Sequence, residues 1–276
     1  MSSKPTFLLI HGAWHDHRTW DRVVPLLEAQ GFRAKAIDLP GAGVHAKFPE
    51  SYRRRPWDAS AFATEISPNA GATQADRTQA VVAEINALGG DVVLVGHSLG
   101  GLSVTSACEA AAEKLRAVVY LFAFMAPPGK SANDVSQHAA MAAGMAPSLF
   151  CADADVVGAM RINPGSENAA YRARLKETFF GDVPSADAAR FAETLHCDEP
   201  VSVALESSPA MVGRTPRHYI RCLADRAIPV AAQDFMIASV DAALGSKTRV
   251  QTLESSHSPF LSQPDKLAAA LITAAS

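Results

Sequence analysis

The 276-residue sequence has few cysteines, no long apolar run and no marked excess of charge of either sign. The four cysteines are scattered and form no C-x-x-C pair, which predicts free thiols in a reduced, cytoplasmic protein. A formal net charge of −3 provides no basic surface for nucleic acid or an anionic membrane. No apolar run approaches the length of a membrane span, and we expect no signal peptide.

Motifs that hold cofactors are also missing. The sequence has no glycine-rich phosphate loop and no dinucleotide-binding fingerprint. His11, His15 and His17 have loose ligand-like spacing, but no set of carboxylates or thiolates accompanies them. We therefore expect no cofactor and no metal.

Hydrophobic residues make up 48% of the chain, which is ample for the core of one α/β domain spanning residues 1–276. Short apolar runs typical of buried strands alternate with helical patterns. This alternation predicts an α/β fold with a mostly parallel central sheet and helices on both of its faces. The predicted strands cover residues 6–10, 32–37, 92–95, 118–122, 217–223 and 248–253.

Two segments interrupt the alternation. Residues 41–72 are rich in Pro, Gly and Ser, and we interpret them as a long surface excursion. Residues of about 130–214 look mostly helical and show no clear buried strand, so we interpret them as a cap between core segments 1–129 and 215–276. A cap that leaves the carboxyl end of a strand would cover the ligand site. Apolar cap residues that could line such a site are Met141, Met145, Leu149, Phe150, Met160, Phe179 and Phe180.

One stretch carries a specific chemical signal. An apolar β-branched run ends at Gly96-His97-Ser98-Leu99-Gly100, and a helical pattern follows at once. A Gly-x-Ser-x-Gly pattern between strand and helix is typical of a nucleophile elbow, which exposes the serine hydroxyl at the carboxyl end of the strand. Leu99 begins the helix, so its N–H has no partner there and can donate to an oxyanion.

A serine nucleophile needs a base, and histidine has a suitable pKa, while a carboxylate must orient that histidine. In hydrolases with this elbow the order along the chain is Ser, acid, His, which Ser98, Asp225 and His257 follow. Asp225 and His257 each come after a predicted strand, so all three should meet at one edge of the sheet. Glu254 and Asp234 are alternative acids. The loop after the first strand should supply a second oxyanion donor, the N–H of Ala13.

The chain resembles the α/β-hydrolase superfamily, and more closely the plant methylesterase and hydroxynitrile lyase group with its bacterial carboxylesterase relatives. The resemblance covers about 5–126 and 216–275, is weak across the cap and is absent for 41–72. The motifs that carry it are His11-Gly12-Ala13 with His15 and Trp20, Pro25-Leu26-Leu27-Glu28, Asp38-Leu39, Leu94 to Gly101, Ala123-Phe124-Met125, Asp225 to Pro229, and His257.

The resemblance implies an α/β-hydrolase fold, Ser98, His257 and Asp225 as catalytic residues, and Ala13 with Leu99 as oxyanion donors. The predicted substrate-contacting residues are Trp14, His15, Phe124 and Met125. One lyase branch has Glu before the serine and Lys after the histidine, and another has Asn at the position of Ala13. Here those positions hold His97, Ser258 and Ala13, which favours ester hydrolysis.

The sequence therefore predicts a serine hydrolase that cleaves carboxylic esters with small to medium apolar or aromatic groups through an acyl-enzyme. A lactonase with the same triad is the first alternative, and a hydroxynitrile lyase and a receptor that binds small molecules without turnover are weaker ones. The expected partner is a small-molecule ester or lactone, with no nucleic acid and no membrane. A homodimer is compatible with the sequence.

Overall fold

The computed structural model describes residues 4–209 and 215–276. Six strands form one sheet in the order β2-β1-β3-β4-β7-β8, and every neighbouring pair is parallel. All six carboxyl ends therefore lie at the same edge, as the sequence predicted. The strands are β1 (Thr6–Ile10), β2 (Arg33–Ile37), β3 (Val92–His97), β4 (Leu115–Leu121), β7 (Arg217–Cys222) and β8 (Arg249–Leu253).

Strands β1 and β3 lie side by side within the sheet, and all their residues are buried. Their unbroken apolar runs suit a sheet that is covered on both faces. The strand order reverses at this pair, since β2 follows β1 on one side while β3 lies on the other. Crevices at such a switch point, outside the carboxyl ends, are where ligands bind in open α/β sheets.

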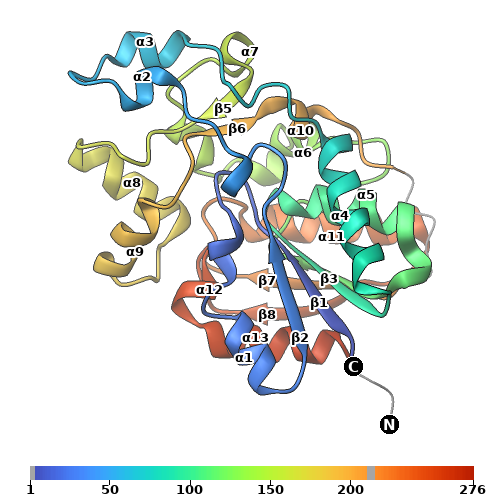
Figure 1. Ribbon diagram of the computed structural model, residues 1–276. Coiled ribbons are helices and arrows are strands. Elements are labelled where there is room, and N and C mark those ends of the chain that lie inside the picture. Colours follow the sequence, from blue (N-terminus) through green and yellow to red (C-terminus); the bar gives the residue numbers. More distant parts are fainter. Residues whose placement is uncertain (1–3, 210–214) are drawn as a thin grey trace.

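Helices cover both faces of the sheet (Figure 1), which confirms the predicted layers. Helices α1 and α13 contact each other on one face, and α4 and α5 contact each other on the opposite face. The helix predicted from about Thr19 starts as a short 3₁₀ turn and continues as α1. The core helices are η1 (His17–Trp20), α1 (Val24–Ala29), α4 (Gln74–Leu88), α5 (Gly100–Ala111), η3 (Ala112–Lys114), α11 (Val230–Leu244), α12 (Pro259–Ser262) and α13 (Pro264–Ala274).

The described residues between β4 and β7 lie over the carboxyl-end edge of the sheet (Figure 1). The expectation of no buried strand here was wrong, because β5 and β6 form a buried antiparallel pair. Each has only three residues, too few to show a strand period. The last predicted cap residues, 210–214, lie outside the described residues. The elements are α6 (Ala132–Ser136), η4 (Ala139–Met141), η5 (Ala146–Leu149), α7 (Ala154–Val157), β5 (Ala159–Arg161), α8 (Ala169–Phe179), α9 (Ser185–Ala192), β6 (Asp198–Pro200) and α10 (Val201–Leu205).

Residues 41–72 are more than a surface excursion, because they pack against the cap. They contain η2 (Gly43–His45), α2 (Glu50–Arg53) and α3 (Ala59–Thr64), which lie beside the cap in Figure 1. The guanidinium of Arg161 on β5 is fully buried and pairs with Asp198 on β6 at 2.7 Å. The same group donates to the carbonyls of Phe62 and Glu65. One arginine thus joins both cap strands to the 41–72 segment.

Among the helices of residues 4–209 and 215–276, none combines the length and apolar character that a membrane span needs.

Candidate active site

Ser98 lies at the tight turn between β3 and α5. Its backbone has a φ of 52°, in the left-handed region that non-glycine residues seldom occupy. Glycine is required two residues later, at Gly100, because a Cβ there would lie only 2.3 Å from the carbonyl oxygen of His11. This close packing of α5 on the loop after β1 places the serine at the switch point of the sheet, where it is 8% exposed.

The three predicted catalytic side chains meet at the carboxyl-end edge. His257 Nε2 lies 3.0 Å from Ser98 Oγ, and His257 Nδ1 lies 2.8 Å from Asp225 Oδ2. Asp225 and His257 are 4% and 1% exposed, so water hardly competes for these hydrogen bonds. A proton on Nδ1 leaves Nε2 free to accept the serine proton, which is the arrangement that a general base requires.

The carboxylate of Asp225 is fixed in orientation by its own turn. Its Oδ1 accepts hydrogen bonds from the backbone N–H groups of Ala227 and Ile228 at 2.8 and 2.9 Å, which leaves Oδ2 for the histidine. Of the two alternative acids, Asp234 pairs with Arg221 at 2.7 Å. Glu254 is exposed, and both ring nitrogens of His257 have other partners, Asp225 and Ser98.

The predicted oxyanion donors flank the serine. Within the described parts of the chain, the backbone N–H groups of Ala13 and Leu99 have no hydrogen-bond acceptor. Gly12 lets the loop after β1 approach the serine, because a Cβ at this position would lie 2.7 Å from the Cβ of Ser98. Two free donors beside a nucleophile can stabilise a negative oxygen during attack on a carbonyl.

Trp14 ties this loop to the cap. Its φ of 61° is left-handed, and its indole N–H donates to the carbonyl of Met160 on β5 at 2.8 Å. Its carbonyl accepts from the N–H of His196 at 2.7 Å, and its own N–H lies 3.4 Å from Glu199 Oε2. Glu199 in turn pairs with Arg77 of α4 at 2.5 Å, with both side chains almost fully buried. The cap strands thereby hold the loop that presents the Ala13 N–H.

The other predicted substrate-contacting residues lie around the serine at different depths. Phe124 is half-buried, and its N–H donates to the carbonyl of Ser98 at 2.9 Å. Met125 is fully buried, and its N–H approaches the sulfur of Met236 at 3.3 Å. His15 is 2% exposed, and its Nε2 has no partner among the described residues.

Aromatic rings surround the imidazole of His257, and one of them, Phe122, was not among the residues that the sequence singled out for the site. The ring centroid of His257 lies 5.0 Å from that of Phe122 and 5.8 Å from that of Phe179. Phe122 directly follows β4, so its position at a strand end was the signal that could have identified it.

Burial lowers the pKa of His15 to about 3 and that of His97 well below its usual value, so both are neutral near pH 7.

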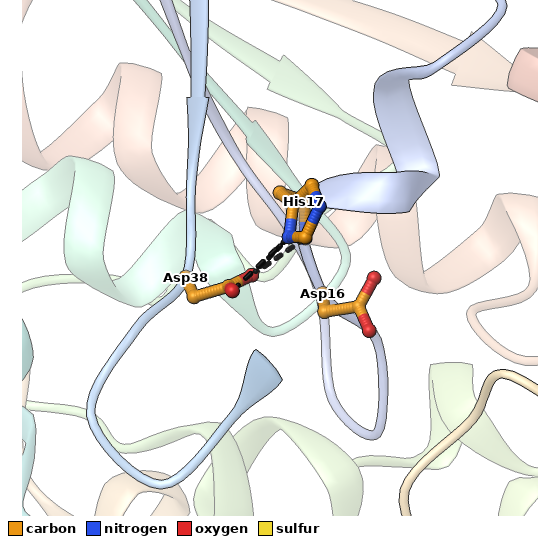
Figure 2. A group of neighbouring side chains, drawn as sticks. All are labelled: Asp16, His17 and Asp38. Atoms are coloured by element: carbon orange, nitrogen blue, oxygen red, sulfur yellow. Dashed lines mark hydrogen bonds and ion pairs between the residues drawn. The ribbon is translucent and has the colours of Figure 1, made fainter. Parts of the chain in front are cut away.

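Asp16, His17 and Asp38 form a group of side chains of the kinds that bind metal ions. Their possible ligand atoms lie within 4.8 Å of one another. Figure 2 shows His17 facing Asp38, while the carboxylate of Asp16 turns away from both. His17 Nδ1 lies 2.9 Å from Asp38 Oδ1. Asp38 also accepts from the N–H of Val44, and Asp16 pairs with Arg18. The candidate ligand atoms of these three residues therefore already have partners within the protein. The absence of a metal stays a prediction.

The chain belongs to the alpha/beta hydrolase family, whose model matches residues 7–270. This confirms the family resemblance drawn from the motifs.

Named proteins are similar to this chain over nearly its whole length. A pyrethroid hydrolase of Sphingobium wenxiniae is 30% identical over 96% of this chain and 85% of its own length, and methylesterase 2 of Arabidopsis thaliana is 28% identical over 99% and 96%. A crystal structure of a pyrethroid hydrolase from Sphingobium faniae matches with a TM-score of 0.76 and 26% identity, over 98% of this chain and 97% of that chain. An Arabidopsis thaliana chloroplastic protein provisionally named methylesterase 11 is 29% identical over 95% of this chain, which spans 61% of that protein's length. The names of these relatives agree with the prediction of an enzyme that hydrolyses carboxylic esters.

Proposed function

We propose that this protein is a serine hydrolase that cleaves carboxylic esters through an acyl-enzyme on Ser98, with His257 as base and Asp225 as the acid that orients it. The observation that carries this proposal is the continuous hydrogen-bonded arrangement from Asp225 through His257 to Ser98, at 2.8 and 3.0 Å. The named relatives support the same chemistry, since they are esterases and a pyrethroid hydrolase.

In the first half of the reaction, His257 Nε2 takes the hydroxyl proton as Ser98 Oγ attacks the ester carbonyl carbon. The carbonyl oxygen becomes negative and accepts hydrogen bonds from the N–H groups of Ala13 and Leu99. When the tetrahedral intermediate collapses, the bond to the alcohol oxygen breaks and His257 returns its proton to the leaving alcohol. The acyl group stays on Ser98 as an ester.

In the second half, water takes the place of the alcohol. His257 removes a proton from the water as its oxygen attacks the acyl carbon, and the same two N–H groups stabilise the second oxyanion. Collapse then releases the carboxylic acid, and the proton on His257 returns to Ser98 Oγ. Asp225 keeps the Nδ1 proton in place throughout and stabilises the imidazolium.

The aromatic rings packed around the triad support esters with small to medium apolar or aromatic groups as substrates. The rings of Phe122 and Phe179 lie against His257, and the ring of Trp14 lies 5.7 Å from that of Phe179. A lactone would meet the same groups, so ester and lactone substrates need to be compared directly. A cytoplasmic location and a possible homodimer remain predictions.

The direct test compares hydrolysis of p-nitrophenyl acetate and butyrate by the wild type and by Ser98→Ala. We expect Ser98→Ala to lower kcat by at least about 10⁴-fold, because the remaining groups cannot form the acyl-enzyme. Ser106→Ala is the matched control, because Ser106 lies on the same helix, α5, away from the triad. Equal rates for Ser98→Ala and wild type would remove Ser98 from the mechanism.

A further inference from the structure

The loop that carries His257 is held by the cap on both sides of the histidine. Ser256, which precedes His257, donates its hydroxyl proton to Asp182 Oδ1. Ser258, which follows it, donates to the backbone carbonyl of Phe179 at 2.7 Å. Phe179 ends α8, and Asp182 lies in the turn after it. We call these two acceptors the cap latch.

Asp182 collects more hydrogen bonds than this one. Its Oδ2 accepts from the hydroxyls of Ser255 and Ser262, each at 2.9 Å, and from the amide of Gln263 at 3.4 Å. Ser255 and Ser256 are each 1% exposed, so bulk water cannot readily replace the carboxylate as their acceptor.

The carboxylate is ionised near neutral pH. Partial burial acts to raise the pKa of Asp182, but the hydrogen bonds from the serine hydroxyls outweigh burial and lower it. Hydrogen bonds to an ionised acceptor are about twice as strong as neutral ones, which suits a group that fixes a loop.

The core also supports the same loop, for example through the amide of Gln263, which donates to the carbonyl of Glu254 at 2.6 Å. The backbone N–H of Ala224 donates to the carbonyl of Ser255 at 3.0 Å, and Asp225 holds the imidazole through Nδ1. The backbone after the histidine is held from two sides, because the carbonyl of Ser258 accepts from the N–H groups of Leu261 and Ser262 in α12 at 2.9 and 3.1 Å, while its hydroxyl reaches the cap. The position of Nε2 relative to Ser98 therefore depends on a segment of the cap as well as on the core.

We propose that Asp182 is a positioning residue, which holds the His257 loop through serine hydroxyls so that the imidazole stays aligned with Ser98. This inference rests on the proposed function and extends it, because the cap then aligns the base as well as covering the site. Misplacing a reacting group by about 1 Å can lower a rate by about 10²-fold.

The test is Asp182→Ala in the full-length protein, assayed with p-nitrophenyl butyrate. We expect kcat to fall by about 10- to 100-fold, while KM changes little because Asp182 touches none of the predicted substrate-contacting residues. Asp187→Ala is the matched control. Asp187 is also a cap carboxylate, but its partners are Arg22 and Arg190 rather than the His257 loop. This variant should keep the wild-type kcat.

A second pair of variants separates positioning from a loss of folding. Ser256→Ala removes one hydrogen bond of the latch without leaving a buried charge, and should lower kcat in the same direction by a smaller factor. In the double variant with Asp182→Ala, the two effects should be less than multiplicative, because both remove the same contact. Thermal unfolding of each variant checks that the protein is folded, and if Asp182→Ala does not fold, Asp182→Asn and Ser256→Ala carry the test.

Two results would overturn the inference: a folded Asp182→Ala with the same kcat as Asp187→Ala, or a rise in KM at unchanged kcat. Ser98→Ala keeps this inference separate from the proposed function. If Ser98→Ala is inactive but Asp182→Ala is not impaired, only the positioning role fails. If Ser98→Ala retains full activity, the proposed function itself fails.

Discussion

The buried ion pair between Arg77 and Glu199 offers a quantitative test of how the cap is attached. Both side chains are at most 2% exposed, and their charged groups lie 2.5 Å apart. Glu199→Gln keeps the shape of the side chain but leaves the guanidinium of Arg77 buried without its countercharge. Breaking a buried pair in this way costs about 3–5 kcal/mol. For a chain of this size about 2 °C of Tm is lost per kcal/mol, so Tm should fall by about 6–10 °C.

The matched control is an exposed pair elsewhere in the chain. Arg116 and Asp91 lie 2.8 Å apart, but their side chains are 42% and 39% exposed. Asp91 has a φ of 54°, a conformation that asparagine also tolerates, so Asp91→Asn removes the charge without added strain. Exposed ion pairs contribute at most about 1 kcal/mol to the free energy of unfolding.

Thermal and urea unfolding, followed by circular dichroism, measure the Tm and the free energy of unfolding of both variants. Arg77→Met combined with Glu199→Gln should be less destabilised than the sum of the single variants, because no unpaired charge remains. The reasoning is refuted if Glu199→Gln is no less stable than Asp91→Asn, since burial would then make no difference to the pair.

Two further predictions concern the loop after β1. Gly12→Ala should lower kcat for p-nitrophenyl butyrate by at least about 10-fold, because the new Cβ would lie 2.7 Å from that of Ser98. Gly71→Ala adds a Cβ in open space and should leave kcat unchanged. Equal kcat values for the two variants would argue against the close approach of Gly12 to Ser98. Burial lowers the pKa of His11 to about 4 and that of His15 to about 3, so below pH 6.5 the unfolded chain binds more protons. The free energy of unfolding should fall between pH 6.5 and 4 by up to about 1.4 kcal/mol per pH unit for each histidine. Urea unfolding at pH 7, 6 and 5 measures this slope. His15→Phe should reduce the slope, and an unchanged slope would contradict the lowered pKa of His15.

The sheet and the triad geometry could be predicted because their signals are local. The runs at β1 and β3 are fully buried and apolar, and the residues that follow parallel strands must meet at one edge. Ser98, Asp225 and His257 each come after a strand of the parallel sheet, so their proximity could be predicted from the order of the strands.

The cap could not be predicted in the same way, because its organising contacts join residues far apart in sequence. Arg161 is completely buried only because Asp198 and carbonyls of the 41–72 segment surround it. A lone arginine or glutamate in a helical stretch is typical of an exposed surface. Asp182 gives no signal by itself either, and the serines around His257 show their role only once the turn after α8 is placed beside them.

The insertion of the cap between two neighbouring strands also shapes how the protein folds. Val118 on β4 pairs with Arg217 on β7, so about a hundred residues must be looped out before these strands can join. Contacts of such high sequence separation slow folding. The proposed nucleophile precedes this loop, and the acid and base both follow it. Recovery of esterase activity during refolding would therefore report the closure of the sheet itself, while earlier, locally formed intermediates would remain silent.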